Sequence, residues 1–173
     1  MSYDLFLFKP IEGEDPLKTA ERILEEEEND VLDLEKEEID TIDEEKEYLK
    51  NHIASKLIEV NPALEKYGDI QLIGPEDGNG IQIIISGDSV SISVPYWHSG
   101  EHAKEVFNEI TSYIKVIEAE ANYLTFDPQL EQIIDVDVDL PEILGVNEHV
   151  IDQMSNVIPK PTPDKKQPWW KFW

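Results

Sequence analysis

The chain has 173 residues, of which 40% are hydrophobic and 31% charged, and it contains no cysteine. Its 39 acidic residues outnumber its 14 basic residues, so the formal net charge is −25. A surface this acidic repels nucleic acid and anionic membranes, and a chain without cysteine has no disulfides, thiolate catalysis or cysteine-ligated metals. We expect no membrane span, because no run of about 18 apolar residues is present. The N-terminus lacks the pattern of a secretory signal, so we expect a cytoplasmic protein.

The charge is concentrated in one part of the chain. Residues 21–47 hold 15 acids and 3 bases, a net charge of −12. Residues 160–173 hold four lysines and one aspartate, a net charge of +3. An acidic first third is therefore joined, through a mixed middle, to a short basic end.

The first third contains one strand and two helices in our prediction. Asp15 caps the first helix with Pro16 at its first position, and Asp43 caps the second. The predicted elements are a strand at 3–8, a helix at 16–28, a loop at 29–42, a helix at 43–60 and a further helical turn at 62–67.

The middle of the chain contains clustered strands and one long helix. Alternation is clearest at 89–94, where Val90, Ile92 and Val94 alternate with serines, which is typical of an antiparallel sheet with one solvated face. The predicted elements are strands at 70–73, 80–85 and 89–94, an amphipathic helix at 99–117, a strand at 122–126, an extended segment at 131–136 and a short helix at 140–158. Prolines then predict a stiff linker.

These elements predict an α+β fold. We expect a two-layer sandwich, with an antiparallel sheet of about four or five strands covered by helices, in the order β-α-α-β-β-β-α-β plus a C-terminal extension. The organisation we expect is a core domain at 1–140 with an acidic helical segment at 16–60, a helical extension at 141–158, and a proline-rich linker with an aromatic tail at 159–173.

Two groups of side chains have the spacing of metal ligands, and neither is a complete site. His98 and His102 have the spacing of two zinc ligands on a helix, but no third ligand is evident and Ser99 follows the first histidine. Asp135, Asp137 and Asp139 resemble the start of a calcium loop. That loop requires glycine at its sixth position and glutamate at its twelfth, and both are missing. We interpret the aspartates as a solvated strand edge with Val136 and Val138 facing inward.

No catalytic pattern is present in the sequence. It has no cysteine, no Gly-x-Ser-x-Gly motif and no phosphate-binding loop. Glutamates at 25–28 and 44–45 offer carboxylate pairs, but nothing nearby buries them and shifts their pKa. We therefore expect no catalytic residues, no metal and no cofactor, and a protein that is not an enzyme.

The acid-rich region supports two interpretations, charge for solubility or a surface that attracts a basic protein. The second predicts partner-binding residues at Glu25, Glu26, Glu27, Glu28, Glu37 and Glu38.

The aromatic C-terminus also needs an explanation, because exposed aromatic residues on a proline linker are costly unless they dock. We expect docking on this domain, on a second copy of the chain, or on a partner. The aromatic residues concerned are Trp169, Trp170, Phe172 and Trp173.

Three short motifs resemble those of a loose group of small bacterial cytosolic proteins. They are the opening Tyr3-Asp4-Leu5 strand, Pro95-Tyr96-Trp97 before the main helix, and Asp127-Pro128-Gln129 after the last core strand. Members of the group are mostly uncharacterised, and several look like immunity proteins paired with polymorphic toxins. The resemblance carries no catalytic residue, and it covers neither the acidic region nor the tail.

We therefore expect a non-enzymatic protein-binding protein. Together with the resemblance, the charge favours an immunity-type inhibitor that occludes a cationic toxin domain. The alternative is a structural or regulatory module that docks through its aromatic tail, and an uncharacterised hydrolase or metal enzyme is the third hypothesis.

Overall fold

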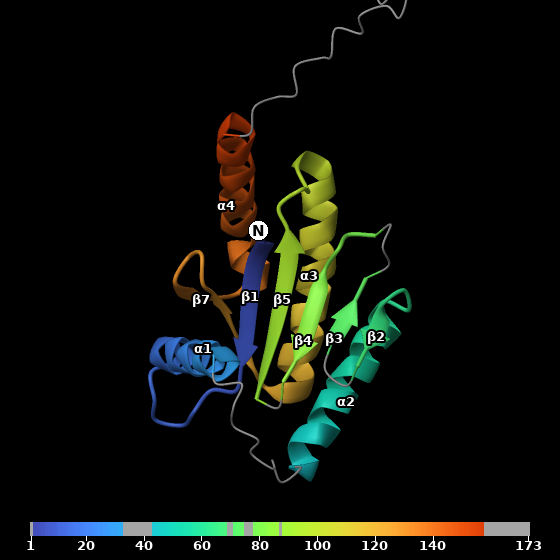
Figure 1. Ribbon diagram of the computed structural model, residues 1–173, viewed down its shortest axis with the longest axis vertical. Helices are drawn as coiled ribbons and strands as arrows, with labels where there is room; N and C mark the ends of the chain where they lie inside the picture. The colour runs from blue at the N-terminus through green and yellow to red at the C-terminus, as the bar shows by residue number, and fades with distance from the viewer. Residues whose placement is uncertain (1, 33–42, 69–70, 75–77, 87, 158–173) are drawn as a thin grey trace, which may run out of the picture.

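The computed structural model describes residues 2–32, 43–68, 71–74, 78–86 and 88–157, with the backbone alone for 27–32, 71, 73 and 155–157. Figure 1 shows the helices and strands of these residues arranged around one sheet. The elements are β1 (Ser2–Phe8), α1 (Pro16–Leu32), α2 (Glu44–Val60), β2 (Glu65–Tyr67), β3 (Gln71–Ile73), β4 (Gln82–Ile85), β5 (Ser89–Pro95), α3 (Gly100–Ala121), β6 (Leu124–Asp127), β7 (Gln132–Ile134) and α4 (Val136–Val157).

The strands form one antiparallel sheet in the order β2-β3-β4-β5-β1-β6-β7. The predicted α+β class, the antiparallel pairing and the order of the main elements are confirmed. The described sheet has seven strands, more than expected, because β2 forms where a helical turn was predicted and β7 adds an edge. Strand β1 pairs with both β5 and β6, so the first segment of the chain lies inside the sheet.

The main core lies between one face of the sheet and helices α2, α3 and α4. Strand β5 places Val90, Ile92 and Val94 on this inner face, and β1 and β4 contribute side chains beside them. Helix α3 packs Phe107, Ile110 and other apolar residues into the same cluster. The predicted packing of the β5 stripe against the α3 stripe is confirmed.

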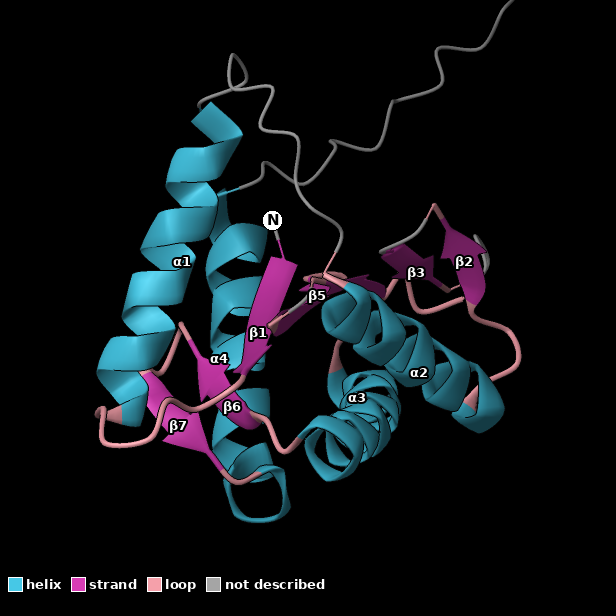
Figure 2. Cartoon of the chain, turned by 90° about the horizontal axis from the view of Figure 1, so that it is seen from below, coloured by secondary structure: helices cyan, strands magenta, loops and turns pink. Residues whose placement is uncertain are grey.

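Helix α1 packs on the opposite face of the sheet, which corrects the two-layer prediction. Figure 2 shows α1 on one side of the sheet, with α2 and α3 on the other. Phe6 and Phe8 of β1 point to the α1 side and form a second cluster with Phe126 and Ala20. Part of the sheet therefore lies between two helical layers, which explains why β1 is apolar on both faces.

Helix α4 corrects our interpretation of the aspartates. The Asp135 carboxylate accepts a hydrogen bond from the Asp137 backbone N–H at 2.9 Å, and Asp139 accepts one from the Asp135 N–H at 2.8 Å. These contacts cap the N-terminus of a helix that begins at Val136, where the sequence predicts a strand edge and a helix from 140. Val136 is buried, but Val138 is 69% exposed, so the two valines do not share an inward face.

Candidate functional site

The acidic face of α1 follows from the way the helix covers the sheet. The Asp15 carboxylate accepts a hydrogen bond from the Leu17 N–H at 2.9 Å and caps the helix as predicted. The apolar stripe of α1 packs against the second cluster, so the acidic positions between those residues face solvent. Arg22 pairs with Glu14 at 3.3 Å and with Glu26 at 3.1 Å, which leaves this surface largely acidic.

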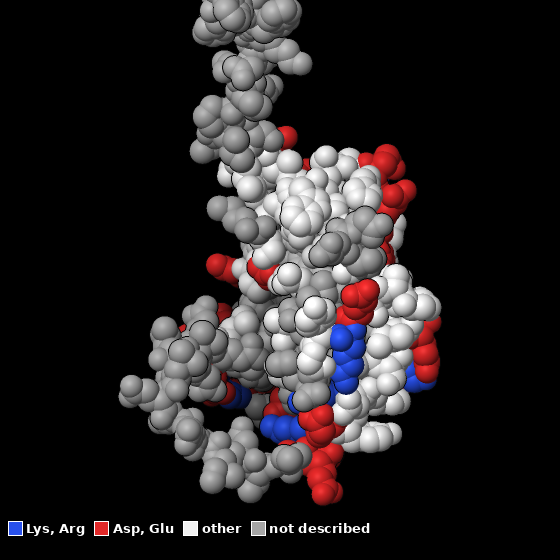
Figure 3. All heavy atoms as spheres, turned by 45° about the vertical axis from the view of Figure 1, so that its right-hand side comes forward, with Lys and Arg blue, Asp and Glu red and all other residues white. Residues whose placement is uncertain are grey.

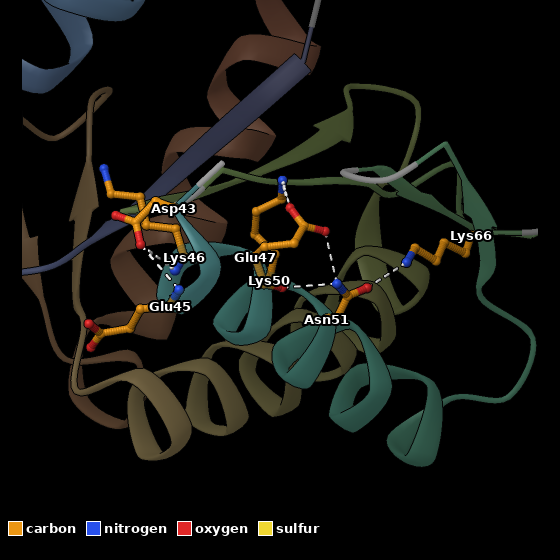
Figure 4. A network of polar contacts seen from close by, with 7 residues as sticks. All are labelled: Asp43, Glu45, Lys46, Glu47, Lys50, Asn51 and Lys66. Atoms are coloured by element: carbon orange, nitrogen blue, oxygen red, sulfur yellow. Dashed lines mark hydrogen bonds and ion pairs between the residues drawn. The ribbon is translucent and has the colours of Figure 1, made fainter. Parts of the chain in front are cut away.

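The acids at the start of α2 have a structural role of their own. The Asp43 carboxylate accepts from the backbone N–H groups of Glu45 at 3.1 Å and Lys46 at 3.3 Å, so the predicted cap is confirmed. Glutamates in the first turn favour the positive end of the helix dipole. Figure 4 shows how this network continues across Lys50 and Asn51 toward β2. These acids are therefore explained without a partner.

Two lysines add an ion pair and a hydrogen bond to the polar contacts along α2. Lys50 pairs with Glu47 at 2.8 Å, and the Asn51 amide donates to the Glu47 carboxylate at 2.9 Å. Lys66 of β2 donates to the Asn51 side-chain oxygen at 3.0 Å (Figure 4). On the face shown in Figure 3, acidic side chains lie at both ends and the basic ones lie in the lower half.

A hollow of about 460 Å³ lies where the end of β1 meets α1 and the turn between β4 and β5. The backbone N–H of Lys9 donates to the Asp88 carbonyl at 3.2 Å and joins two of these segments. Ile11 is 46% exposed at this hollow, so apolar surface is open between charged groups. The lining residues are Lys9, Pro10, Ile11, Arg22, Ile23, Glu26 and Asp88.

This hollow was not expected from the sequence. Its residues come from three segments, and Asp88 also pairs with Lys46 of α2. The available signal was an isoleucine in the Pro- and Gly-containing loop after β1, which predicts an exposed apolar side chain. The charges that line the hollow balance, because Lys9 and Arg22 lie beside Glu26 and Asp88, so what the hollow offers a partner is the apolar surface at Ile11.

The structure places only part of the predicted partner-binding set. Glu25 and Glu26 lie exposed on α1, and Glu26 borders the hollow. Glu27 and Glu28 continue the same helix, with only their backbone described. The remaining predicted positions lie outside the described residues: Glu37, Glu38, Trp169, Trp170, Phe172 and Trp173.

A second polar cluster surrounds Glu109 of α3. Its carboxylate accepts from Asn61 at 2.7 Å, from Asn79 at 2.5 Å and from the Tyr113 hydroxyl. The cluster borders a small hollow of about 120 Å³ and ties the end of α2 to the loop before β4. Burial is the main reason that the pKa of Tyr113 is raised, and the hydrogen bond to Glu109 adds to it. With every carboxylate oxygen paired, the cluster holds three elements together.

His98 and His102 are close, but the structure adds no further ligand to them. Their ring centroids lie 4.9 Å apart, and His98 is buried. His98 Nε2 lies 2.6 Å from the Asn79 carbonyl oxygen and donates its hydrogen to it. His98 Nδ1 and Asn147 Oδ1 are buried without a partner. Within the described residues, no group of three or more His, Asp or Glu side chains is arranged to hold a metal ion.

Comparisons with known proteins add no relative. No family model, curated protein or solved structure matches this chain. Among the helices that the structure describes, none is long and apolar enough to cross a membrane.

Proposed function

We propose that this chain is a non-enzymatic binding protein that captures a cationic protein through the surface formed by α1 and the 460 Å³ hollow. The observation that carries the proposal is that α1 exposes acidic side chains, of which Glu26 borders an open apolar site at one end of the sheet. Acidic groups steer a basic partner over a distance of about one Debye length, roughly 8–10 Å at ordinary salt, and the apolar floor supplies contact area.

The resemblance to immunity proteins supports a proposal for the kind of partner. An immunity-type inhibitor occludes the active site of its toxin, and the substrate-binding surface of a nuclease toxin is cationic. The acid-rich region, with a net charge of −12 over residues 21–47, complements such a surface. We therefore propose the basic domain of a toxin encoded next to this chain as the partner.

The test asks whether this surface, rather than the net charge of the whole chain, controls the rate of association with the partner. The double substitution Glu25→Lys and Glu26→Lys is compared with Glu101→Lys and Glu105→Lys on α3, which changes the net charge equally. Stopped-flow mixing with the toxin domain at low salt measures association. We expect the α1 variant to associate about tenfold more slowly, and the α3 variant to slow much less.

Salt dependence and cell survival complete the experiment. Added salt should lower the wild-type association rate steeply and the rate of the α1 variant only weakly. Co-expression of the wild-type chain should protect cells from the toxin domain. Equal slowing by both double substitutions would contradict the proposed surface, and a neighbouring toxin that the chain does not bind would contradict the immunity proposal.

A further inference from the structure

Trp97 packs against the backbone of Gly80 although it is exposed. It follows β5 and is 69% exposed. Gly80 has a φ of +66°, and a Cβ added there would lie 2.6 Å from the Trp97 Cζ2 atom. The indole therefore lies directly against the Gly80 backbone, in space that only glycine leaves open. A large aromatic ring that packs on the backbone and stays open to solvent offers apolar contact area to a binding segment.

Polar side chains stand beside this ring on the outer face of the sheet. A hollow of about 290 Å³ is lined by Ser2, Gln82 and Ser93 together with Gly80, Pro95 and Trp97. Ser93 pairs with Gln82 on one side and with Asp4 on the other, so the polar positions form one row across three strands. The Ser2 hydroxyl donates to the Asp4 carboxylate at 2.9 Å, which places a negative charge at the margin.

This combination fits a polyproline II segment. Such a segment has no internal hydrogen bonds, so its carbonyl groups accept hydrogen bonds from hydroxyl and amide donors while its prolines pack on aromatic rings. The sequence of this chain offers a candidate for such a segment, since prolines occur at 159, 161, 163 and 168. Lysines at 160, 165 and 166 give this segment a charge complementary to Asp4. Residues 159–168 lie outside the described residues.

The length of the chain allows the contact. The Asn147 side-chain amide of α4 donates to the His98 carbonyl at 3.2 Å, which places α4 next to the residue after Trp97. The ten helical residues from there to Val157 extend about 15 Å. The next ten residues in polyproline II geometry span about 31 Å, enough to return over that distance and to cross the hollow.

We propose that the Trp97 hollow is a receptor site for a polyproline II segment, and that its occupant is the segment 159–168 of the same chain. The contact holds the aromatic C-terminus on the outer face of the sheet, where α1 does not cover β4 and β5. It involves none of the side chains of the proposed partner surface, so the two proposals fail independently.

Limited trypsin digestion of the full chain tests the contact. Lys165 and Lys166 are cleavable, and release of the C-terminal peptide is followed by mass spectrometry. We expect the segment to be protected in the wild type, and Trp97→Ala should accelerate release by about tenfold. Tyr48→Ala is the matched control, because it also removes an exposed aromatic ring and should leave the rate unchanged. An unchanged rate in Trp97→Ala, or equal acceleration in the control, would overturn the proposal.

Fluorescence distinguishes the occupant. Trp169, Trp170 and Trp173 are changed to phenylalanine in the full chain, which leaves Trp97 as the only tryptophan. Replacing Pro159, Pro161 and Pro163 with glycine should then shift its emission to the red and increase acrylamide quenching. If the shielding of Trp97 from acrylamide disappears on dilution, the contact is made by a second copy and the same-chain proposal is wrong. If the emission of Trp97 does not respond to the proline replacements, the proposed site is wrong.

Discussion

The Tyr3 hydroxyl on β1 donates a hydrogen bond to the carboxylate of Asp127 at the end of β6, and both side chains are fully buried. The other carboxylate oxygen accepts from the backbone N–H groups of Gln129 at 2.8 Å and Leu130 at 3.0 Å. One carboxylate therefore fixes the turn after β6 and attaches it to the first strand.

This pair makes stability depend on pH. Burial raises the pKa of Asp127 above its usual value of 3.8, and the hydrogen bonds oppose that rise. The folded state then holds the proton more tightly, so the contribution of Asp127 is greatest at low pH and falls as pH rises through the raised pKa. The difference in the free energy of unfolding between the wild type and Asp127→Asn measures this contribution. We expect the difference to fall by up to about 1.4 kcal/mol per pH unit as pH rises through the raised pKa of Asp127. Urea melts of both proteins over about pH 3.5 to 7 measure it, and a difference that is constant or rises with pH would contradict the prediction.

The core shared by β5 and α3 predicts that truncating its side chains lowers the free energy of unfolding strongly. Ile92 and Ile110 are almost fully buried in one cluster. Ile92→Ala and Ile110→Ala should each lower the free energy of unfolding by about 2–5 kcal/mol, because each leaves a cavity. Ser91→Ala, on the outer face of the same strand, is the control and should cost little. Urea melts in which the serine change is the most damaging would show that the faces are reversed.

The hydrogen bonds of the Glu109 cluster predict that a carboxylate at position 109 is required for full stability. In Glu109→Gln one acceptor oxygen becomes an N–H₂ group that faces donors from Asn61, Asn79 or Tyr113. We expect a loss of about 1–3 kcal/mol in the free energy of unfolding, because a buried or half-buried donor loses its partner. Glu105→Gln, on an exposed side chain of the same helix, is the control and should be nearly neutral. Equal thermal stability of the two variants would contradict a structural role for the cluster.

His98 predicts a loss of stability on mild acidification. Burial lowers its pKa below the usual 6.5, and the nearby His102 adds to this. The unfolded state then binds more protons, so stability from His98 is present above pH 6.5 and is lost as pH falls below it. We expect the wild type to lose stability relative to His98→Gln over that range. An NMR titration of the His98 ring with a midpoint at or above 6.5 would contradict the prediction.

Several elements could be predicted because their determinants are local. The alternation of valine and isoleucine with serine in β5 requires only that a strand places neighbouring side chains on opposite faces. The spacing of apolar residues in α3 and the Asp43 cap of α2 are equally local. By contrast, Asp135, Asp137 and Asp139 fit two local structures, a strand with one acidic face and a capped helix start. Packing of Val136 and Ile143 into the core selected the helix.

The sequence by itself determined the strong negative charge, the α+β class and the order of the main elements, since composition and periodicity depend on no distant residue. Only the tertiary structure decided which face of the sheet α1 covers, because Phe6 and Phe8 acquire a cluster only when β6 brings Phe126 beside them. It also decided where the two proposed binding surfaces lie. Gly80 and Trp97 meet because antiparallel pairing of β4 with β5 brings the start of one strand to the end of the other. Such a contact depends on the register of the sheet, which no local pattern specifies.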